Sequence, residues 1–310
     1  MKSIIFDVDT GIDDALAMAY AVNSPELDII GFTSCYGNVS VGEATRNTLA
    51  VLEKLGKFIP VYKGADKPLQ RETKEDFAKG VHGKDGLGNA LEREPDSKAE
   101  NISAIDFIIS QVKEKPHEIT IIAVGPLTNI ALAIQKAPEI VPLVKEVIIM
   151  GGAVRVPGNV TPYGEANIVS DPEAANIVLS SGLSVTLVGL DVTMQTLLPI
   201  SKLAPWRDSG NKVGQFYAEM TEYYIGAYES FYPGIGGCAL HDPLAVGVAI
   251  NPDLVQTELM GIKVVTEGEE TGNTVGYEVE NPTVRVCTRV QADQFLQHFL
   301  QRIETSWEYK

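Results

Sequence analysis

The feature that most constrains this fold is a regular alternation of short apolar runs with segments of helical periodicity. Five runs have the length and apolar character of buried strands, at residues 3–8, 27–34, 118–124, 144–150 and 184–190. Interleaved with them are five segments with apolar residues at helical spacing, at residues 13–22, 41–55, 104–113, 128–134 and 172–180. Because parallel strands need a helix-length crossover, this alternation predicts βα units and a parallel sheet.

The remaining segments extend the prediction to the whole chain. Residues 64–101 are rich in charge and glycine and predict a long surface excursion, whereas residues 215–232 form an aromatic helical pattern that could act as a flap. Further helices are expected at 242–250 and 292–303, and alternating patterns occur at 261–266, 274–279 and 283–288. We expect a single domain over residues 1–310, of the α/β class: an open, mostly parallel, Rossmann-like central sheet flanked by helices, plus a small C-terminal antiparallel portion.

The charge and cysteine content restrict the partners and the compartment. A formal net charge of −16 repels phosphate backbones and anionic lipid, so we expect a small-molecule partner and neither nucleic acid nor membrane. Cys35, Cys238 and Cys287 are widely spaced, which predicts neither a disulfide framework nor a thiolate metal site. The apolar run after Met1 is too short for a signal peptide, and no run reaches transmembrane length. A cytoplasmic protein is therefore expected.

The strongest chemical signal is a cluster of four carboxylates, Asp7, Asp9, Asp13 and Asp14, between the first predicted strand and the first predicted helix. Helix capping needs one carboxylate, not four, and like charges held close are relieved by a proton or a cation. Oxygen-only ligands favour hard ions, so the cluster predicts a divalent cation site at the carboxyl end of a parallel strand. For Asp7 alone, a hydrogen-bonding structural role is the preferred interpretation.

Asn38 and other polar residues follow the ends of predicted strands, and further polar motifs lie elsewhere in the chain. His241-Asp242-Pro243 opens an apolar helix, and Asp242 could complete the oxygen-ligand site with His241 beside it as a proton donor. The same three residues are also a common helix start, and that interpretation prevails when the motif is taken alone. Similarly, Asn159 is typical of a turn, and Asp171 of a helix N-cap; we interpret Asp171 as structural.

Eight motifs, in order along the chain, resemble those of the inosine-uridine preferring nucleoside hydrolase family. They are DVDTGIDDA at 7–15, YGN at 36–38, HG at 82–83, GPLTN at 125–129, MGG at 150–152, GN and EAN between 158 and 167, SDPEAA at 170–175 and HDP at 241–243. Two departures from the family pattern are Thr10, where proline is common, and Ala166, where a bulky aromatic residue is usual.

The resemblance implies roles for individual residues. The metal would be Ca²⁺, ligated by side chains of Asp9, Asp14 and Asp242 and by the backbone carbonyl of Val124. Five polar residues would hold the ribose hydroxyls: Asp13, Asn38, Asn159, Glu165 and Asn167. Met150 would pack nearby, and two of the hydroxyls would also bind the metal. His82, Tyr228 and His241 would surround the nucleobase. Family members form homodimers or homotetramers, so a homo-oligomer is expected.

The resulting hypothesis is hydrolysis of the N-glycosidic bond of an inosine- or uridine-type ribonucleoside to ribose and free base. A Ca²⁺-bound water would attack the anomeric carbon with Asp9 as general base, and His241 would protonate the leaving base. Two alternatives stay open at this point. A haloacid-dehalogenase-like phosphatase also has paired aspartates after a strand, but Gly11 stands where that signature has Thr. A catalytically silent nucleoside- or metal-binding protein would keep the same residues.

Overall fold

The computed structural model describes residues 1–72 and 77–305 and contains a nine-stranded sheet in the order β10-β9-β11-β6-β5-β4-β1-β2-β3. The strands are β1 (Lys2–Val8), β2 (Leu27–Ser34), β3 (Val61–Lys63), β4 (Ile119–Ala123), β5 (Glu146–Met150), β6 (Val185–Val188), β9 (Val255–Val264), β10 (Thr274–Tyr277) and β11 (Val284–Val290). All pairs from β11 to β3 are parallel, and β9 pairs antiparallel with β11 and β10. The predicted α/β fold with an antiparallel C-terminal portion is confirmed.

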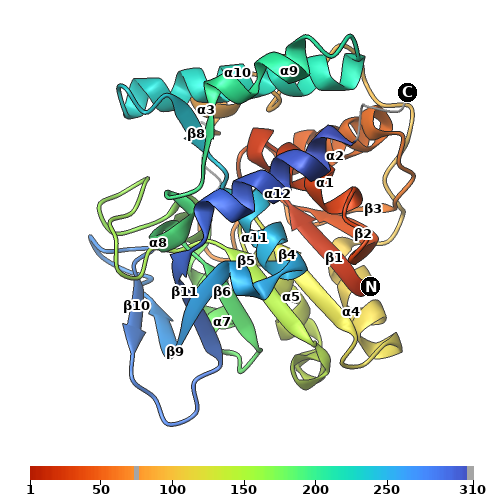
Figure 1. The fold of residues 1–310 in the computed structure, drawn as a ribbon. Coiled ribbons are helices and arrows are strands. Elements are labelled where there is room, and N and C mark those ends of the chain that lie inside the picture. Colours follow the sequence, from red (N-terminus) through yellow and green to blue (C-terminus); the bar gives the residue numbers. More distant parts are fainter. Residues whose placement is uncertain (73–76, 306–310) are drawn as a thin grey trace.

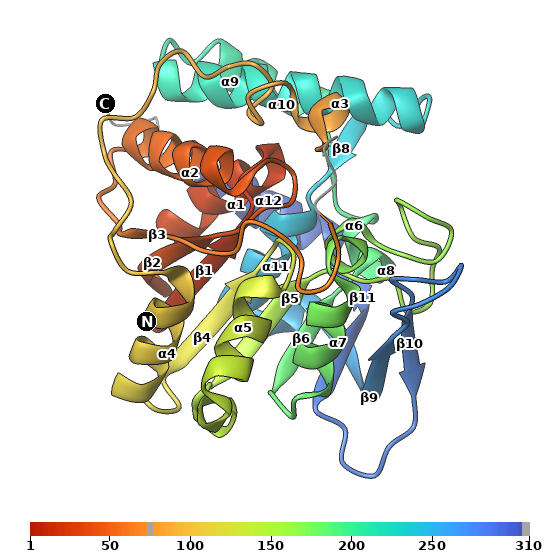
Figure 2. The same ribbon diagram turned by 180° about the vertical axis from the view of Figure 1, so that it is seen from behind.

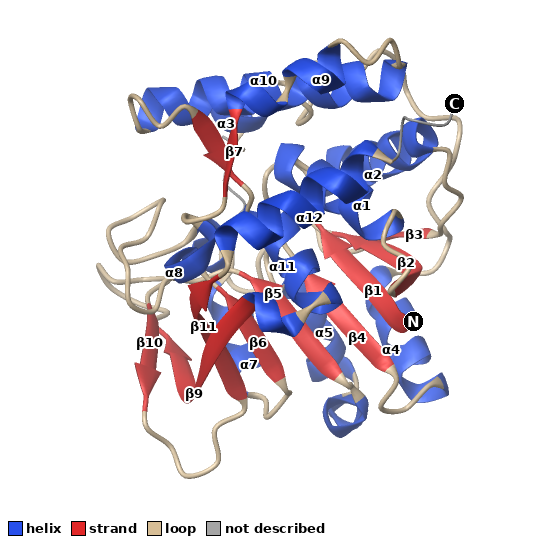
Figure 3. Cartoon of the chain, in the orientation of Figure 1, coloured by secondary structure: helices blue, strands red, loops and turns tan. Residues whose placement is uncertain are grey.

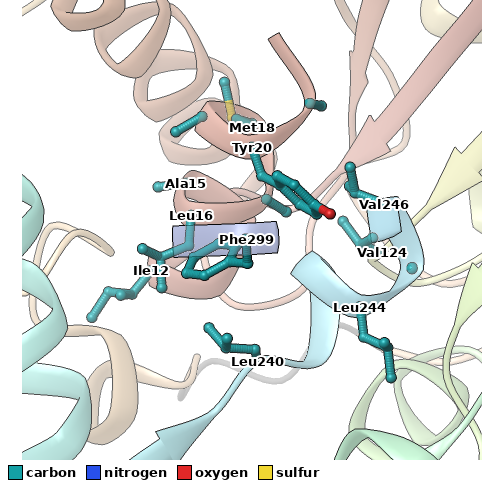
Figure 4. Close-up of a cluster of buried hydrophobic side chains, with 14 of the residues drawn as sticks. Ile12, Ala15, Leu16, Met18, Tyr20, Val124, Leu240, Leu244, Val246 and Phe299 are labelled. Carbon is teal, nitrogen blue, oxygen red and sulfur yellow. The ribbon is translucent and has the colours of Figure 1, made fainter. Parts of the chain in front are cut away.

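Helices cover both faces of the sheet (Figures 1 and 2). One face carries α1 (Ile12–Val22), α2 (Val41–Leu55), α11 (His241–Ile250) and α12 (Ala292–Glu304), and the other carries α4 (Ala104–Glu114), α5 (Thr128–Lys136) and α7 (Pro172–Ser180). On the first face, Tyr20 packs edge-on against Phe295 and Phe299 within a large buried cluster. Figure 4 shows α1, α11 and α12 meeting there through residues such as Leu16, Leu244 and Phe299.

Local capping explains why several helices begin where they do. Ser40 and Glu43 form a reciprocal capping box at the start of α2, and Gly56 ends this helix in the left-handed conformation. At α7, the Asp171 side chain accepts the N–H of Ala174 and Pro172 occupies the first turn. The structural interpretation of Asp171 is thereby confirmed.

A third layer lies across the carboxyl ends of the parallel strands (Figure 3). It contains α3 (Lys79–His82), α9 (Ala204–Arg207) and α10 (Lys212–Phe231), joined to the body through the two-stranded sheet of β7 (Leu197–Pro199) and β8 (Gly237–Ala239). The proposed aromatic flap is thus a continuous 20-residue helix. Shorter elements complete the fold: α6 (Ala166–Ser170), α8 (Leu190–Thr193), η1 (Pro138–Leu143), η2 (Ile200–Lys202) and η3 (Pro252–Leu254).

The segment 64–101 is only partly the surface excursion that its composition predicts. His82 and Leu87 are buried, and a Cβ at Gly88 would meet the backbone of Met220 on α10. Residues 73–76 of this segment lie outside the described part of the chain. Across the described helices, none is both long and apolar enough to cross a membrane.

The strand order places a crevice where ligands bind in open α/β sheets. Strand β1 has β2 on one side and β4 on the other, and the chain leaves β1 and β4 towards opposite faces of the sheet. In such sheets, the loops that follow the two strands diverge and leave a cleft at their carboxyl ends. Asp9 follows β1 and Val124 follows β4, so both lie at this position.

Candidate functional site

A cavity of about 510 Å³ opens at the carboxyl ends of the parallel strands. Its lining includes eleven residues that the sequence had singled out: Asp13, Asn38, His82, Val124, Met150, Asn159, Glu165, Asn167, Tyr228, His241 and Asp242. Asp9 and Asp14 do not line it directly, but both contact Asn38: Oδ2 of Asp9 accepts the Asn38 backbone N–H at 2.7 Å and Oδ2 of Asp14 accepts the Asn38 amide at 3.1 Å. The thirteen predicted residues therefore form one continuous site.

The floor of the cavity is acidic. Carboxylate oxygens of Asp13, Asp14 and Asp242 lie within 4.8 Å of one another, and all three residues are buried. Asp9 adjoins this trio, because its backbone N–H donates to Asp14 Oδ1 at 3.1 Å. Residues that are more than 220 positions apart in the sequence are brought together because α11 packs beside α1.

Two glycines make room for Asp9. A Cβ at Gly37 would collide with Oδ2 of Asp9, and a Cβ at Gly125 would lie 2.9 Å from Oδ1. Both glycines have ordinary backbone angles, so close approach and not conformation explains them. The YGN and GPLTN motifs thus shape the wall around one carboxylate.

The electrostatics of the floor favour a bound cation. Burial, followed by repulsion from neighbouring carboxylates, raises the pKa of Asp14 to about 7 and raises the pKa values of Asp9 and Asp242 well above the usual range. Within the described residues, Asp9 Oδ1, Asp13 Oδ1 and Asp242 Oδ2 are buried without a hydrogen-bond partner. Unpaired buried carboxylate oxygens are costly, and a hard divalent ion satisfies them.

One wall of the cavity is polar and ordered by backbone contacts. The carboxylate of Glu165 caps α6 by accepting the N–H groups of Asn167 and Ile168, and it also accepts the N–H of Gly152 at 3.0 Å. The amide of Asn167 donates to the carbonyls of Val124 and Met150, at 2.8 and 3.1 Å. Asn159 is exposed and accepts the N–H of Ala166 at 3.1 Å. This wall presents fixed donors and acceptors of the kind that bind sugar hydroxyls.

A second wall is aromatic. His82 accepts the backbone N–H of Ile12 on Nδ1 at 3.0 Å, so a neutral His82 carries its proton on Nε2. The ring of Tyr224 stacks on His82 with a centroid distance of 5.4 Å, and its hydroxyl donates to Asp13 at 3.3 Å. Burial lowers the pKa of His82 and keeps it neutral at neutral pH.

His241 is held at both ring nitrogens. Its Nε2 lies 2.6 Å from the hydroxyl of Tyr228, and its Nδ1 lies 2.7 Å from the hydroxyl of Thr193. Burial lowers the pKa of His241, although Asp13 opposes this shift. The imidazole is therefore oriented and linked to hydroxyl groups through which a proton can move.

Sequence reasoning missed Tyr224 and Thr193. Tyr224 precedes the predicted Tyr228 by one helical turn, so the i, i+4 spacing on the expected helix was the signal that could have found it. Thr193 follows β6 closely, and the polar residue after a parallel strand end is the same signal that identified Asn38. The Asp7 carboxylate accepts the hydroxyl of Thr33 and the amide of Asn129, which confirms its structural interpretation.

Comparisons with known proteins agree with this geometry. Residues 4–297 match the family described as inosine-uridine preferring nucleoside hydrolase. The chain is 39% identical to a probable uridine nucleosidase 2 of Arabidopsis thaliana, with 98% of each chain covered. It is 36% identical to the pyrimidine-specific ribonucleoside hydrolase RihB of Escherichia coli, covering 88% of this chain and 87% of that one. A solved purine-preferring ribonucleoside hydrolase from Gardnerella vaginalis has a TM-score of 0.96 at 43% identity, covering 98% of this chain and 99% of that one.

Proposed function

Because this chain belongs to the inosine-uridine preferring nucleoside hydrolase family, it is a ribonucleoside hydrolase, and we propose that Asp9 is its general base and His241 its general acid. The observation that carries the proposal is the pairing, in one cavity, of a buried carboxylate floor with a histidine held between two hydroxyls. The family match over residues 4–297 removes the phosphatase alternative.

A divalent cation fits the floor of this cavity. We propose Ca²⁺, held by side chains of Asp9, Asp14 and Asp242 and by the carbonyl of Val124, because these are the oxygen ligands that this ion prefers. The close approach of Asp13, Asp14 and Asp242 and the unpartnered oxygens of Asp9, Asp13 and Asp242 support the proposal. When bound, such a cation supplies Lewis-acid polarisation of a water molecule and of vicinal sugar hydroxyls.

Asp9 is suited to accept the proton of the attacking water. Its Oδ2 is occupied by the N–H of Asn38, whereas its buried Oδ1 has no partner among the described residues. The same residue has a raised pKa in the absence of a cation, caused mainly by burial, which brings it towards the range of a useful base.

The ribose lies, in this proposal, between the floor and the polar wall. Asp13, Asn38, Asn159, Glu165 and Asn167 would bind its hydroxyls, and Met150 would pack against the ring. As the C–N bond lengthens, the sugar gains oxocarbenium character, and the negative floor stabilises the developing positive charge. Preorganisation supports this role, since backbone N–H groups and helix starts already fix the carboxylates of Asp14 and Glu165.

The nucleobase would lie against the aromatic wall between His82, Tyr228 and His241. His241 would donate a proton to the leaving base and recover one through Tyr228, which is within hydrogen-bond distance. We propose inosine- and uridine-type substrates. The named relatives include both pyrimidine-specific and purine-preferring hydrolases, so the base preference has to be measured.

The enzyme is also proposed to work in the cytoplasm as a homodimer or homotetramer, with residues 1–310 acting as one domain. The three cysteines are buried and free, which suits a reducing compartment. Light scattering of the purified protein would give its oligomeric state, and a monomer would contradict that part of the proposal.

The central experiment measures ribose released from inosine, uridine, cytidine and adenosine, with and without prior chelation of divalent metal. Ribose release that disappears on chelation and returns with Ca²⁺ supports the proposed chemistry and ranks the bases. Release that is insensitive to chelation would contradict the metal role. No release from any nucleoside would favour a silent binding protein, which equilibrium binding of inosine would then detect.

A further inference from the structure

A second cavity of about 420 Å³ adjoins the first behind the polar wall. Five residues line both cavities: Asn38, Ala78, Val160, Ala166 and Asn167. Ala166 stands between Glu165 and Asn167, which both line the first cavity, and its own side chain is a single methyl group. At this point the wall of the substrate cavity therefore has a residue too small to close it.

The orientation of a bound ribonucleoside, which rests on the proposed function, determines what faces this opening. The base lies against His82, Tyr228 and His241, and the vicinal 2′ and 3′ hydroxyls lie over the acidic floor. The remaining substituent of the sugar is C5′. It is attached to C4′, which the ring oxygen separates from C1′, the carbon that carries the base. It therefore faces the polar wall of Asn159, Glu165 and Asn167, and hence the gap at Ala166.

The lining of the second cavity selects for uncharged groups. Tyr36, Pro68, Phe77 and Val169 give it aromatic and aliphatic surface. Its acidic and basic lining among the described residues consists of three carboxylates, Asp9, Glu72 and Glu269, and one cation, Arg71.

Arg71 is already paired with a carboxylate and a backbone carbonyl. Its guanidinium donates to both carboxylate oxygens of Glu173, with a shortest distance of 2.7 Å, and to the carbonyl of Thr266. The pairing lowers the pKa of Glu173 and raises that of Arg71, so both groups stay ionised and their charges offset each other. A phosphate dianion at this position would face the carboxylates of Glu72 and Glu269, which disfavour it, whereas the charge of Asp9 is offset by the proposed cation.

We propose that the second cavity is a subsite for substituents on C5′, and that the enzyme hydrolyses ribonucleosides whose 5′-hydroxyl is replaced by a small uncharged group such as an alkyl thioether. The cleaved bond is the same C1′–N bond, with water as the only co-reactant. The thioether occupies the space behind Ala166 and leaves the contacts of the 2′ and 3′ hydroxyls unchanged.

The test compares kcat/KM for three substrates of one base: inosine, 5′-deoxy-5′-methylthioinosine and inosine 5′-monophosphate. The wild-type enzyme is expected to hydrolyse the thioether within about tenfold of inosine and the monophosphate at least 100-fold more slowly. In Ala166→Phe, the ring fills the opening, and the ratio of thioether to inosine kcat/KM is expected to fall at least tenfold. Ala166→Ser, which keeps a small side chain, is the matched control and should preserve the ratio.

A second variant tests the subsite independently, in case Ala166→Phe does not fold. Thr271 lines the second cavity and not the first, so Thr271→Phe should lower the same ratio. Hydrolysis of inosine without hydrolysis of the thioether would overturn the subsite and leave the proposed function intact. If only pyrimidine nucleosides are hydrolysed, the same comparison is made with uridine and its 5′ derivatives, and absence of ribose release from inosine, uridine, cytidine and adenosine alike would refute the function itself. A ratio that is unchanged in both phenylalanine variants would also overturn the subsite, and efficient hydrolysis of the monophosphate would contradict its selectivity for uncharged groups.

Discussion

The hydroxyl oxygen of Tyr228 on α10 lies 2.6 Å from Nε2 of His241 at the start of α11. This contact joins the helical layer above the cavity to the helix that delivers Asp242 to its floor. It also occupies the ring nitrogen that faces the aromatic wall, so the protonation of His241 is coupled to a neighbouring hydroxyl.

Replacing His241 with Ala should slow hydrolysis of inosine or uridine by about 10²- to 10⁴-fold, the usual contribution of a general acid. A ribose derivative with a nitrophenyl leaving group needs no protonation and should lose far less. Steady-state kinetics on both substrates checks this expectation. Equal losses on the two would remove His241 as the acid.

Asp9→Ala should reduce kcat by about 10²- to 10⁴-fold, because the attacking water loses its base. The fold should largely survive, since removing one buried carboxylate relieves repulsion with Asp14 and offsets the lost hydrogen bond from Asn38. Kinetics and thermal melting followed by circular dichroism measure the two effects separately. Full activity in this variant is incompatible with the proposed base.

Chelation should lower the melting temperature more at pH 8 than at pH 5.5. The raised pKa values of Asp9, Asp14 and Asp242 favour the protonated carboxyls in the cation-free fold. Their contribution to stability is therefore complete below the unfolded value near 3.8 and is lost as the pH rises through about 7, the folded value of Asp14. A cation binds the ionised forms, so its stabilising effect grows over the same interval.

Calorimetry with and without Ca²⁺ at several pH values tests this linkage. Asp242→Asn serves as the matched variant, because it removes one ligand charge, and the difference between loaded and chelated protein should shrink. A chelation effect that is independent of pH would show that these carboxylates do not bind the ion.

Gly37→Ala should destabilise the protein by about 1–3 kcal/mol, the usual penalty for forcing extra volume into a packed interior. The added methyl group would collide with Oδ2 of Asp9, so activity should also fall. Gly42→Ala is the control, since nothing lies within 4 Å of its added Cβ. Gly42 is in α2, where alanine is favoured over glycine, and its replacement should be neutral or slightly stabilising.

Much of the fold follows from periodicity alone. The predicted ranges 27–34, 41–55 and 172–180 coincide with β2, α2 and α7, because apolar patterns, Ser40 and Asp171 mark their limits. The strands β3, β7 and β8 were not predicted, since three residues are too few to show a period. Strand β9 begins at Val255, earlier than predicted, because its first half is an exposed stretch of mixed polarity.

The residues of the candidate site also differ in how far the sequence reveals them. Asp9, Asp13 and Asp14 are found because they are crowded in the sequence, and the crowding itself demands an explanation. The contribution of α10 is harder to foresee, since Tyr224 is one of several tyrosines, and only the packing of this helix over α3 selects it. The two cavities at Ala166 depend on how loops meet, which no local pattern encodes.

The pairing of α1 with α11 has a consequence for how the protein matures during synthesis. Strands β1 to β6 and their helices all precede residue 190, so most of the parallel sheet can emerge from the ribosome before Asp242 is made. Until then the floor lacks one of the three carboxylates that lie within 4.8 Å of one another. The proposed cation site is therefore completed late in biogenesis, and on this proposal retention of the cation would report that the newly made chain has been completed through α11.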